Sequence, residues 1–170
     1  MRFYELEKTD ISNLNDGDLR ELVARLCEAE LAQQGVGPVC VLWGGAQEAA
    51  DGGLDVHVKN ATNLKSPSFV PRANVGFQVK KNSMSRSACT KEMLDKTGLP
   101  KEVISKLAEY DGAYIIVSGK DDCSEKMLVE RVSGMRAAVV SLVDKEDFLV
   151  DFYGRDRLLA WLRLYPGVAL

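Results

Sequence analysis

The sequence predicts one α/β domain, a mixed central sheet flanked by helices. Three observations carry this prediction. Two neighbouring segments, 54–59 and 75–81, alternate apolar and polar residues, as half-buried strands do. Two further apolar strand segments, 113–117 and 148–152, come later in the chain, and helical segments separate or flank them. The length of 170 residues is enough for one well-packed core and short for two domains of ordinary size.

The first predicted element is a helix over about 15–34. Asp16 or Asp18 can cap its amino-terminal end, and leucines and valines follow at helical spacing. Glycines and a proline after residue 34 end the helix. The next run, 39–43, is wholly apolar and bounded by glycines, which predicts a buried strand. Residues 46–51 are then a polar connection.

The two alternating strands form the centre of the predicted sheet. Their apolar faces, which should enter the core, consist of Leu54, Val56, Val58, Val75, Phe77 and Val79. Asp55 projects from the polar face of the first strand, and Gln78 and Lys80 project from the polar face of the second. The proline-containing segment 62–72 is the loop between them.

The rest of the chain alternates helices with strands. These elements are helices at 85–96 and from 100 to about 110, a strand at 113–117, a helix at 124–142 weakened at Ser133 and Gly134, a strand at 148–152 and a helix at 155–164. We expect the core elements to occupy about 15–120, with the C-terminal helices and strand in 121–170. The chain stops on an apolar tip after Pro166 and Gly167, so we expect a fragment of a longer polypeptide.

Composition excludes several classes of protein. No apolar run is long enough to span a bilayer, and the acidic start has no signal-peptide core, so we expect a cytoplasmic chain that does not enter the membrane. Four scattered cysteines without a CxxC pair predict buried apolar residues and no zinc site. The net charge of −3 means that affinity for nucleic acid would have to come from a local basic groove.

Asp55, Gln78 and Lys80 lie on neighbouring strands and project from the same polar face, so three polar groups converge. Hydrolysis of a phosphodiester is assisted by a divalent cation, and Mg²⁺ prefers oxygen ligands. The Asp55 carboxylate, the Gln78 amide oxygen and the Val79 backbone carbonyl supply such oxygens. The Lys80 ammonium can orient the attacking water and stabilise negative charge at phosphorus.

The residues Asp51-Gly52-Gly53-Leu54-Asp55-Val56, followed by Phe77-Gln78-Val79-Lys80, resemble the catalytic hairpin of PD-(D/E)xK nucleases, in particular the Mrr-like D…QxK variant. The resemblance implies a restriction-endonuclease-like αβββαβ core. It also implies a DNA endonuclease that uses Mg²⁺, for which Mn²⁺ substitutes, and that cuts double-stranded DNA as a homo-oligomer. Leu54 and Gln78 depart from the family pattern, which has proline and an acidic residue at these positions. Mrr-like members with this glutamine often add a glutamate from the first helix.

Glu30 is the residue that best fits this added glutamate. A rotation of about 100° per residue places Glu30 on the apolar face of the first helix, whereas Glu21 and Glu28 fall on the opposite side. A buried carboxylate requires a cation or a strong donor, so a metal ligand and an ion pair with an inward-facing basic residue both stay open. Glu21, nearer the start of the helix, is the reserve choice.

Lys81, Ser83 and Arg86 follow the second strand at the expected start of a helix, where free backbone amides favour phosphate. They are the candidate DNA-backbone contacts, although the lysines can equally form a solvated turn and the serines can cap the helix. The tail 151–167 resembles the end of nuclease domains fused to antiviral STAND NTPases, which implies NTPase or sensor domains beyond residue 170 and a role in anti-phage defence. The alternative is a catalytically inert DNA- or protein-binding module.

Overall fold

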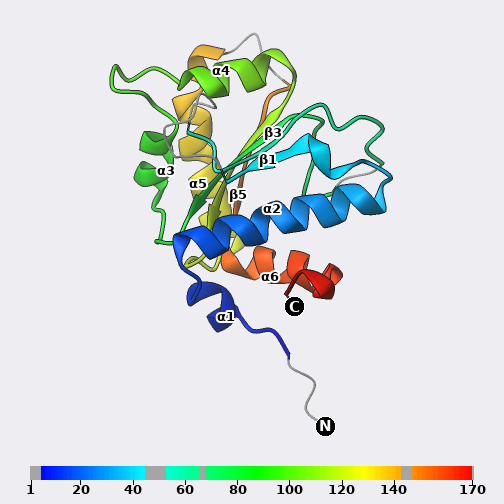
Figure 1. Cartoon of the computed structure of the whole chain (residues 1–170). Coiled ribbons are helices and arrows are strands. Elements are labelled where there is room, and N and C mark those ends of the chain that lie inside the picture. The colour runs from blue at the N-terminus through cyan, green and yellow to red at the C-terminus, as the bar shows by residue number, and fades with distance from the viewer. Residues whose placement is uncertain (1–4, 45–52, 66–67, 143–146, 170) are drawn as a thin grey trace.

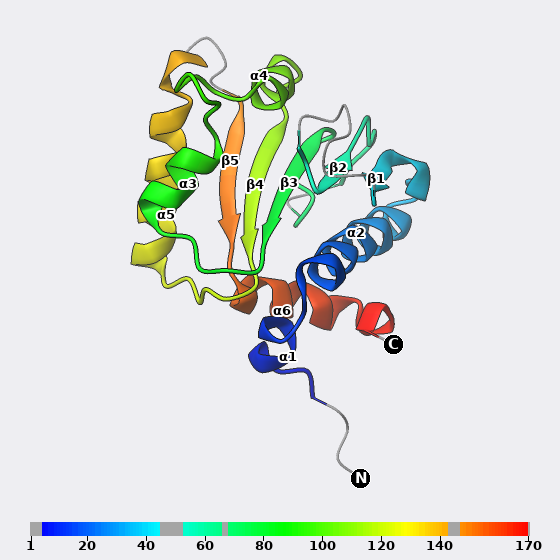
Figure 2. The ribbon, with the colours of Figure 1, turned by 60° about the vertical axis from the view of Figure 1, so that its left-hand side comes forward.

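The centre of the molecule is a five-stranded mixed sheet with helices on both faces (Figures 1 and 2). The computed structural model describes residues 5–44, 53–65, 68–142 and 147–169. The strands follow one another in chain order as β1 (Val41–Trp43), β2 (Val56–Val58), β3 (Val75–Lys80), β4 (Ala113–Ser118) and β5 (Leu149–Tyr153). The first three strands are antiparallel, and β3, β4 and β5 are parallel. The predicted α/β class with a mixed sheet is confirmed.

The helices divide between the two faces of the sheet. They are α1 (Lys8–Ser12), α2 (Asp16–Gln33), α3 (Arg86–Glu92), α4 (Glu102–Glu109), α5 (Glu125–Ala138) and α6 (Arg155–Leu164), with short 3₁₀ turns at Pro38–Cys40, Val140–Leu142 and Pro166–Ala169. Helices α2 and α6 cover one face, and α3, α4 and α5 cover the other. None of the helices in the described ranges has both the length and the apolar character needed to cross a membrane.

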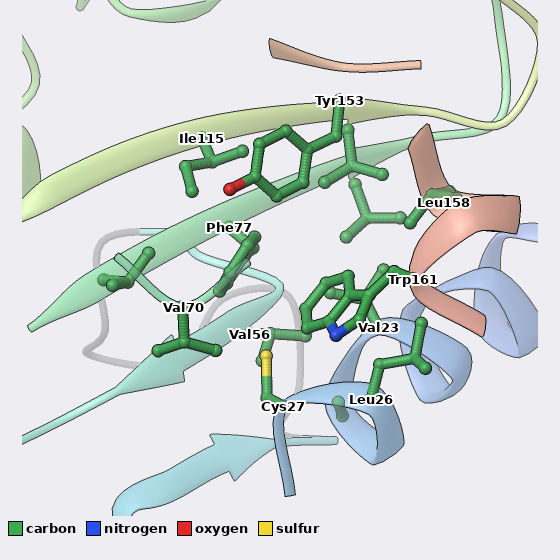
Figure 3. Packing of buried hydrophobic residues seen from close by; sticks show 14 of the residues in the cluster. Val23, Leu26, Cys27, Val56, Val70, Phe77, Ile115, Tyr153, Leu158 and Trp161 are labelled. Carbon is green, nitrogen blue, oxygen red and sulfur yellow. The ribbon is translucent and has the colours of Figure 1, made fainter. Parts of the chain in front are cut away.

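The core beneath α2 and α6 fixes the orientation of β3 (Figure 3). Val75, Phe77 and Val79 all enter this core, as their alternation predicts. Trp161 of α6 stacks on Phe69 with ring centroids 5.1 Å apart. Because the apolar side of β3 is held in this core, the side chains of its alternate residues are directed to the opposite face of the sheet.

The beginning of the sheet differs from the prediction. The segment 39–43 is not a buried strand: β1 has three residues, lies at the sheet edge, and leaves Val39 84% and Leu42 40% exposed. A 3₁₀ turn that starts at Pro38 takes the first residues of the apolar run out of the sheet. The cap of α2 is Asn15, whose side chain accepts from the Asp18 amide at 2.8 Å. The predicted connection at 46–51 lies outside the described residues.

Helix α5 runs without a break through Gly134, where the sequence indicated a weak point. Helix α3, shorter than predicted and capped by Ser85, packs across α5 at this point. Thr90 donates to the Gly134 carbonyl at 2.9 Å, and a Cβ at Gly134 would lie 2.8 Å from the Arg86 carbonyl oxygen. The absence of a side chain at Gly134 therefore allows α3 and α5 to approach closely.

Candidate functional site

A cleft of about 1010 Å³ lies at the end of the sheet where β3 finishes. Residues from β1, the segment before β2, the second half of β3, the amino-terminal half of α2 and the α3 region line it. Asp55, Gln78, Val79 and Lys80 are all among the lining residues. The structure thus brings together the strand-borne residues that the sequence selected.

The Asp55 carboxylate is held from several sides. Its Oδ2 atom accepts from the Val79 backbone amide at 2.7 Å and from the Gln78 side-chain amide at 3.0 Å. Its Oδ1 atom lies 3.5 Å from Nε of Arg20, which reaches across from α2. The Asp55 side chain is only 12% exposed. These contacts fix the direction of the carboxylate before any ligand enters the cleft.

A local irregularity in the chain before β2 places Asp55. Val56 pairs with Phe77 in the ladder, yet the Asp55 amide also donates to the Phe77 carbonyl at 3.1 Å. Two consecutive residues therefore oppose one, as in a β-bulge. Leu54 consequently packs in the core beneath α3, α4 and α5, whereas Val56 lies in the opposite core, so the predicted face of Leu54 is wrong.

The surroundings of Asp55 act on its ionisation in opposite directions. Burial raises the pKa of Asp55 above its ordinary value. The Val79 amide and the positive charges of Arg20 and Lys80 oppose this rise, and the negative charge of Glu92 adds to it. Since burial prevails, the Asp55 carboxylate gains more from a further nearby positive charge than an exposed aspartate would.

Lys80 is held by an anion that the sequence did not indicate. Its ammonium lies 3.1 Å from Oε2 of Glu92, the last residue of α3, and Oε1 of Glu92 lies 3.3 Å from the Lys101 ammonium. Glu92 therefore bridges two lysines on the wall of the cleft. Its contact with Lys80 joins residues that lie twelve positions apart in different elements, and no local pattern in the sequence carries that information.

Arg20 was also missed, although the sequence contains a signal for it. It lies seven and eleven residues before Cys27 and Leu31, so it belongs to the same buried stripe of α2. The helical rotation places Arg20 about 80° from Glu30, at the edge of the predicted apolar face. Only a wider face that includes Cys27 and Leu31 contains Arg20.

Glu30 does face inward, as predicted, and is 3% exposed. It does not line the cleft: its Oε1 accepts from the Val70 amide at 3.2 Å. Arg20 and Glu30 are ten residues apart, which corresponds to about 15 Å along a helix. The predicted convergence of Glu30 with Asp55 is therefore wrong, because helical periodicity gives a direction around the axis and no position along it. Glu21, the reserve choice, is exposed and pairs with Arg25.

The predicted DNA-backbone contacts are only partly gathered in the cleft. Lys81 lines it, whereas Ser83 and Arg86 are exposed residues outside its lining. The positive lining residues are Arg20, Lys80, Lys81, Lys91 and Lys101, and the negative ones are Asp16, Asp55 and Glu92. With five basic against three acidic side chains, the cleft is positive on a chain whose net charge is −3. This local charge suits a polyanionic ligand.

A divalent cation would find a small set of oxygens here. Asp55 offers its Oδ1 atom, which meets Arg20 at 3.5 Å, beyond the length of a strong charge-assisted hydrogen bond. Gln78 and Val79 have an amide and a backbone carbonyl, and Asp16 adds a second carboxylate to the lining. In the described ranges no three His, Cys, Asp or Glu side chains form a ready-made metal cluster. The residues fit Mg²⁺, which is commonly bound through one or two carboxylates together with water and substrate phosphates.

Comparisons with known proteins give no indication of what this chain does. A scan against family models, a search of curated proteins and a search of solved structures each found no match. The charges, contacts and burial of the cleft residues are therefore the evidence for its function.

Proposed function

We propose that this chain is a Mg²⁺-dependent DNA endonuclease domain with a restriction-endonuclease-like fold. The observation that carries the proposal is the meeting of Asp55, Gln78 and Lys80, from neighbouring strand segments, in a positively charged cleft. The carboxylate suits a cation, the ammonium suits the reacting phosphate, and the surrounding charge suits a nucleic-acid backbone.

The order of elements supports the fold assignment. Helix α2 precedes an antiparallel set of three strands, and helical segments then lead to β4, which is parallel to β3. This is the αβββαβ order that the D…QxK resemblance implies. In this arrangement the aspartate of one strand and the QxK residues of the next share one end of the sheet.

The chemistry follows from the positions of the side chains. Asp55, Gln78 and the Val79 carbonyl would hold the cation, which neutralises developing charge and makes a bound water more acidic. Lys80 would stabilise negative charge on the phosphoryl oxygens and orient the water for in-line attack. Glu92 keeps the Lys80 ammonium on the wall of the cleft.

A catalytically inert domain that binds DNA or a partner protein is the second candidate. One observation favours it: the Asp55 carboxylate is already approached by Arg20 and by the amide of Gln78, which stands where an acidic residue would add charge for a metal. Such a domain would use the same positive cleft without cleaving its ligand.

The biological setting is also part of the proposal. The tail resemblance supports an effector domain in cytoplasmic anti-phage defence, fused to an NTPase or sensor beyond residue 170. Double-stranded DNA is the proposed substrate. Because one such site cuts one strand, cutting both strands would need two copies of the site, so a homo-oligomer is part of the proposal.

The experiment is cleavage of plasmid DNA with Mg²⁺ or Mn²⁺ by the chain and by Lys80→Ala and Asp55→Ala. Loss of a residue that stabilises the transition state should lower the rate about 100-fold or more. Lys106→Ala is the control, because Lys106 is an exposed lysine that pairs with Glu102 outside the cleft. If both cleft variants cut as fast as the parent, the site is wrong. If the parent holds DNA without cutting it in the presence of either cation, the inert domain is the better description.

A further inference from the structure

Arg20 is the basic residue that α2 contributes to the cleft. Its side chain is 23% exposed, and its Nε atom lies 3.5 Å from Oδ1 of Asp55 and 3.4 Å from the Asp16 carbonyl oxygen. Arg20 comes from α2 on one face of the sheet, whereas Glu92, which bridges Lys80 and Lys101, belongs to α3 on the other face. The cleft thus receives positive charge from both faces of the sheet.

The Arg20 guanidinium is only loosely engaged. Charge-assisted hydrogen bonds of arginine to carboxylates are commonly about 2.7–2.9 Å long and often bidentate. The contact with Asp55 is longer, and Nε is the closest nitrogen. Within the described residues, neither terminal nitrogen of Arg20 donates a hydrogen bond. These two nitrogens form the planar fork that matches phosphate oxygens.

Arg20 and a divalent cation would compete for the same atom. Oδ1 of Asp55 is the oxygen that faces Arg20, while Oδ2 already accepts two N–H groups. A cation bound at Oδ1 would weaken the pull of Asp55 on the guanidinium and repel it. Lys80 and Lys101 would keep Glu92 as their partner, whereas Arg20 would be left without an anion.

We infer that Arg20 binds a phosphate of the DNA strand in the cleft, and that it competes with the divalent cation for Asp55 when DNA is absent. This inference rests on the proposed function. In the free chain Arg20 lowers the affinity of the site for the cation. In the complex the DNA phosphate replaces Asp55 as the partner of Arg20. Each of the two ligands, the cation and the DNA, therefore increases the affinity of the chain for the other.

The test uses the 170-residue chain and the variants Arg20→Gln and Arg20→Lys. Isothermal titration measures Mn²⁺ binding without DNA, and fluorescence anisotropy measures binding of a short labelled duplex in EDTA at several salt concentrations. We expect Arg20→Gln to bind Mn²⁺ several-fold more tightly. We expect it to bind DNA about tenfold more weakly, with a salt slope smaller by about one, as for the loss of one phosphate contact. Arg20→Lys should retain part of the DNA affinity.

Arg25→Gln is the matched control, because Arg25 lies on the same helix, is exposed, pairs with Glu21 and Glu28, and is not part of the cleft lining. It should leave both affinities unchanged. An Arg20→Gln chain that melts like the parent but binds Mn²⁺ no more tightly overturns the competition. Unchanged DNA affinity and salt slope overturn the phosphate contact. If the parent binds neither Mn²⁺ nor DNA, the proposed function fails and this inference fails with it. If instead the parent cuts DNA and Lys80→Ala does not, a negative Arg20 result counts against Arg20 alone.

Discussion

The two ends of α2 carry charged residues that turn inward, and they meet different surroundings. Near the amino-terminal end, Arg20 enters a cleft and stands beside Asp55, and its terminal nitrogens donate no hydrogen bond within the described residues. Near the other end, Glu30 is enclosed in the core and accepts a hydrogen bond from the Val70 amide. One residue faces a space that a ligand can enter, and the other faces the Val70 segment of its own chain.

An inward-facing charge is therefore not by itself a functional residue. A backbone amide of the fold can hold a buried carboxyl group, as the Val70 amide holds Oε1 of Glu30, while Oε2 of Glu30 makes no hydrogen bond within the described residues. In a cleft the compensating group can be exchanged for a ligand. The predictions below separate the two situations, since cleft residues should change activity and core residues should change stability.

After the replacement of Asp55 or Lys80 themselves, the largest effect is expected at Glu92, in the cleft. Glu92→Gln removes the anion that holds Lys80, and a small misplacement of a catalytic group can lower a rate by up to about 100-fold. We expect a plasmid cleavage rate about 10-fold to 100-fold lower, with little change in melting temperature. Glu102→Gln, which removes an exposed partner of Lys106, is the control and should cut normally. An unchanged rate in Glu92→Gln would show that Lys80 does not need this contact.

The next effect is expected at Glu30, in the core. Glu30→Ala removes one of the two acceptors of the Val70 amide, the other being Oγ of Ser68, and opens a cavity, so we expect the free energy of unfolding to fall by about 2 kcal/mol. Urea denaturation measures it. Glu21→Ala, at an exposed position of the same helix, should change stability by less than about 0.5 kcal/mol. Equal losses in the two variants would remove the contrast between core and surface on which the comparison depends.

Replacement of Asp55 should show how much its buried carboxylate destabilises the folded chain at neutral pH. Because burial raises its pKa in the folded chain above the unfolded value, the folded state holds this proton more tightly. The parent therefore loses stability as pH rises from the unfolded pKa through the folded pKa, and Asp55→Asn does not. In EDTA we expect Asp55→Asn to melt higher than the parent at neutral pH.

The advantage of Asp55→Asn should disappear below about pH 3.5, under the ordinary pKa of an aspartate. Asp147→Asn, at an exposed position, serves as the control for the substitution itself. A difference in melting temperature that is the same at both pH values would mean that ionisation of Asp55 is not its cause.

The smallest effect is expected on the affinity for Mn²⁺ when Glu30 or Glu21, the two glutamates that the sequence offered as ligands, is replaced. Neither Glu30 nor Glu21 lines the cleft, so Glu30→Gln and Glu21→Gln should titrate with Mn²⁺ as the parent does. Asp16→Asn is the informative comparison, because Asp16 is the acidic residue of α2 that does line the cleft. A loss of Mn²⁺ affinity in Glu30→Gln alone would place the cation near Val70 and contradict the assignment of the site.

Features that depend on local periodicity could be predicted from the sequence. The alternation in 75–81 showed that Val75, Phe77 and Val79 enter the core while Gln78 and Lys80 face the other side, and the helix at Arg155–Leu164 has its predicted bounds. The predicted meeting of Asp55 with Gln78 holds as well, although a bulge before β2, which the sequence did not indicate, places Asp55 at this end of the sheet. These predictions succeed because the direction of a side chain follows from the geometry of its own strand or helix.

The distances between residues of different elements depend on how the elements pack, and the sequence pattern does not give them. The tertiary structure separated Glu30 from Asp55, brought Arg20 to the cleft, and carried Glu92 from α3 to Lys80. It also used Gly134 for a helix crossing, where the isolated sequence indicated a weak point. Position along an axis and contact between helices depend on packing against distant segments. Periodicity therefore predicts which way a charge points, and the packed fold decides what it meets.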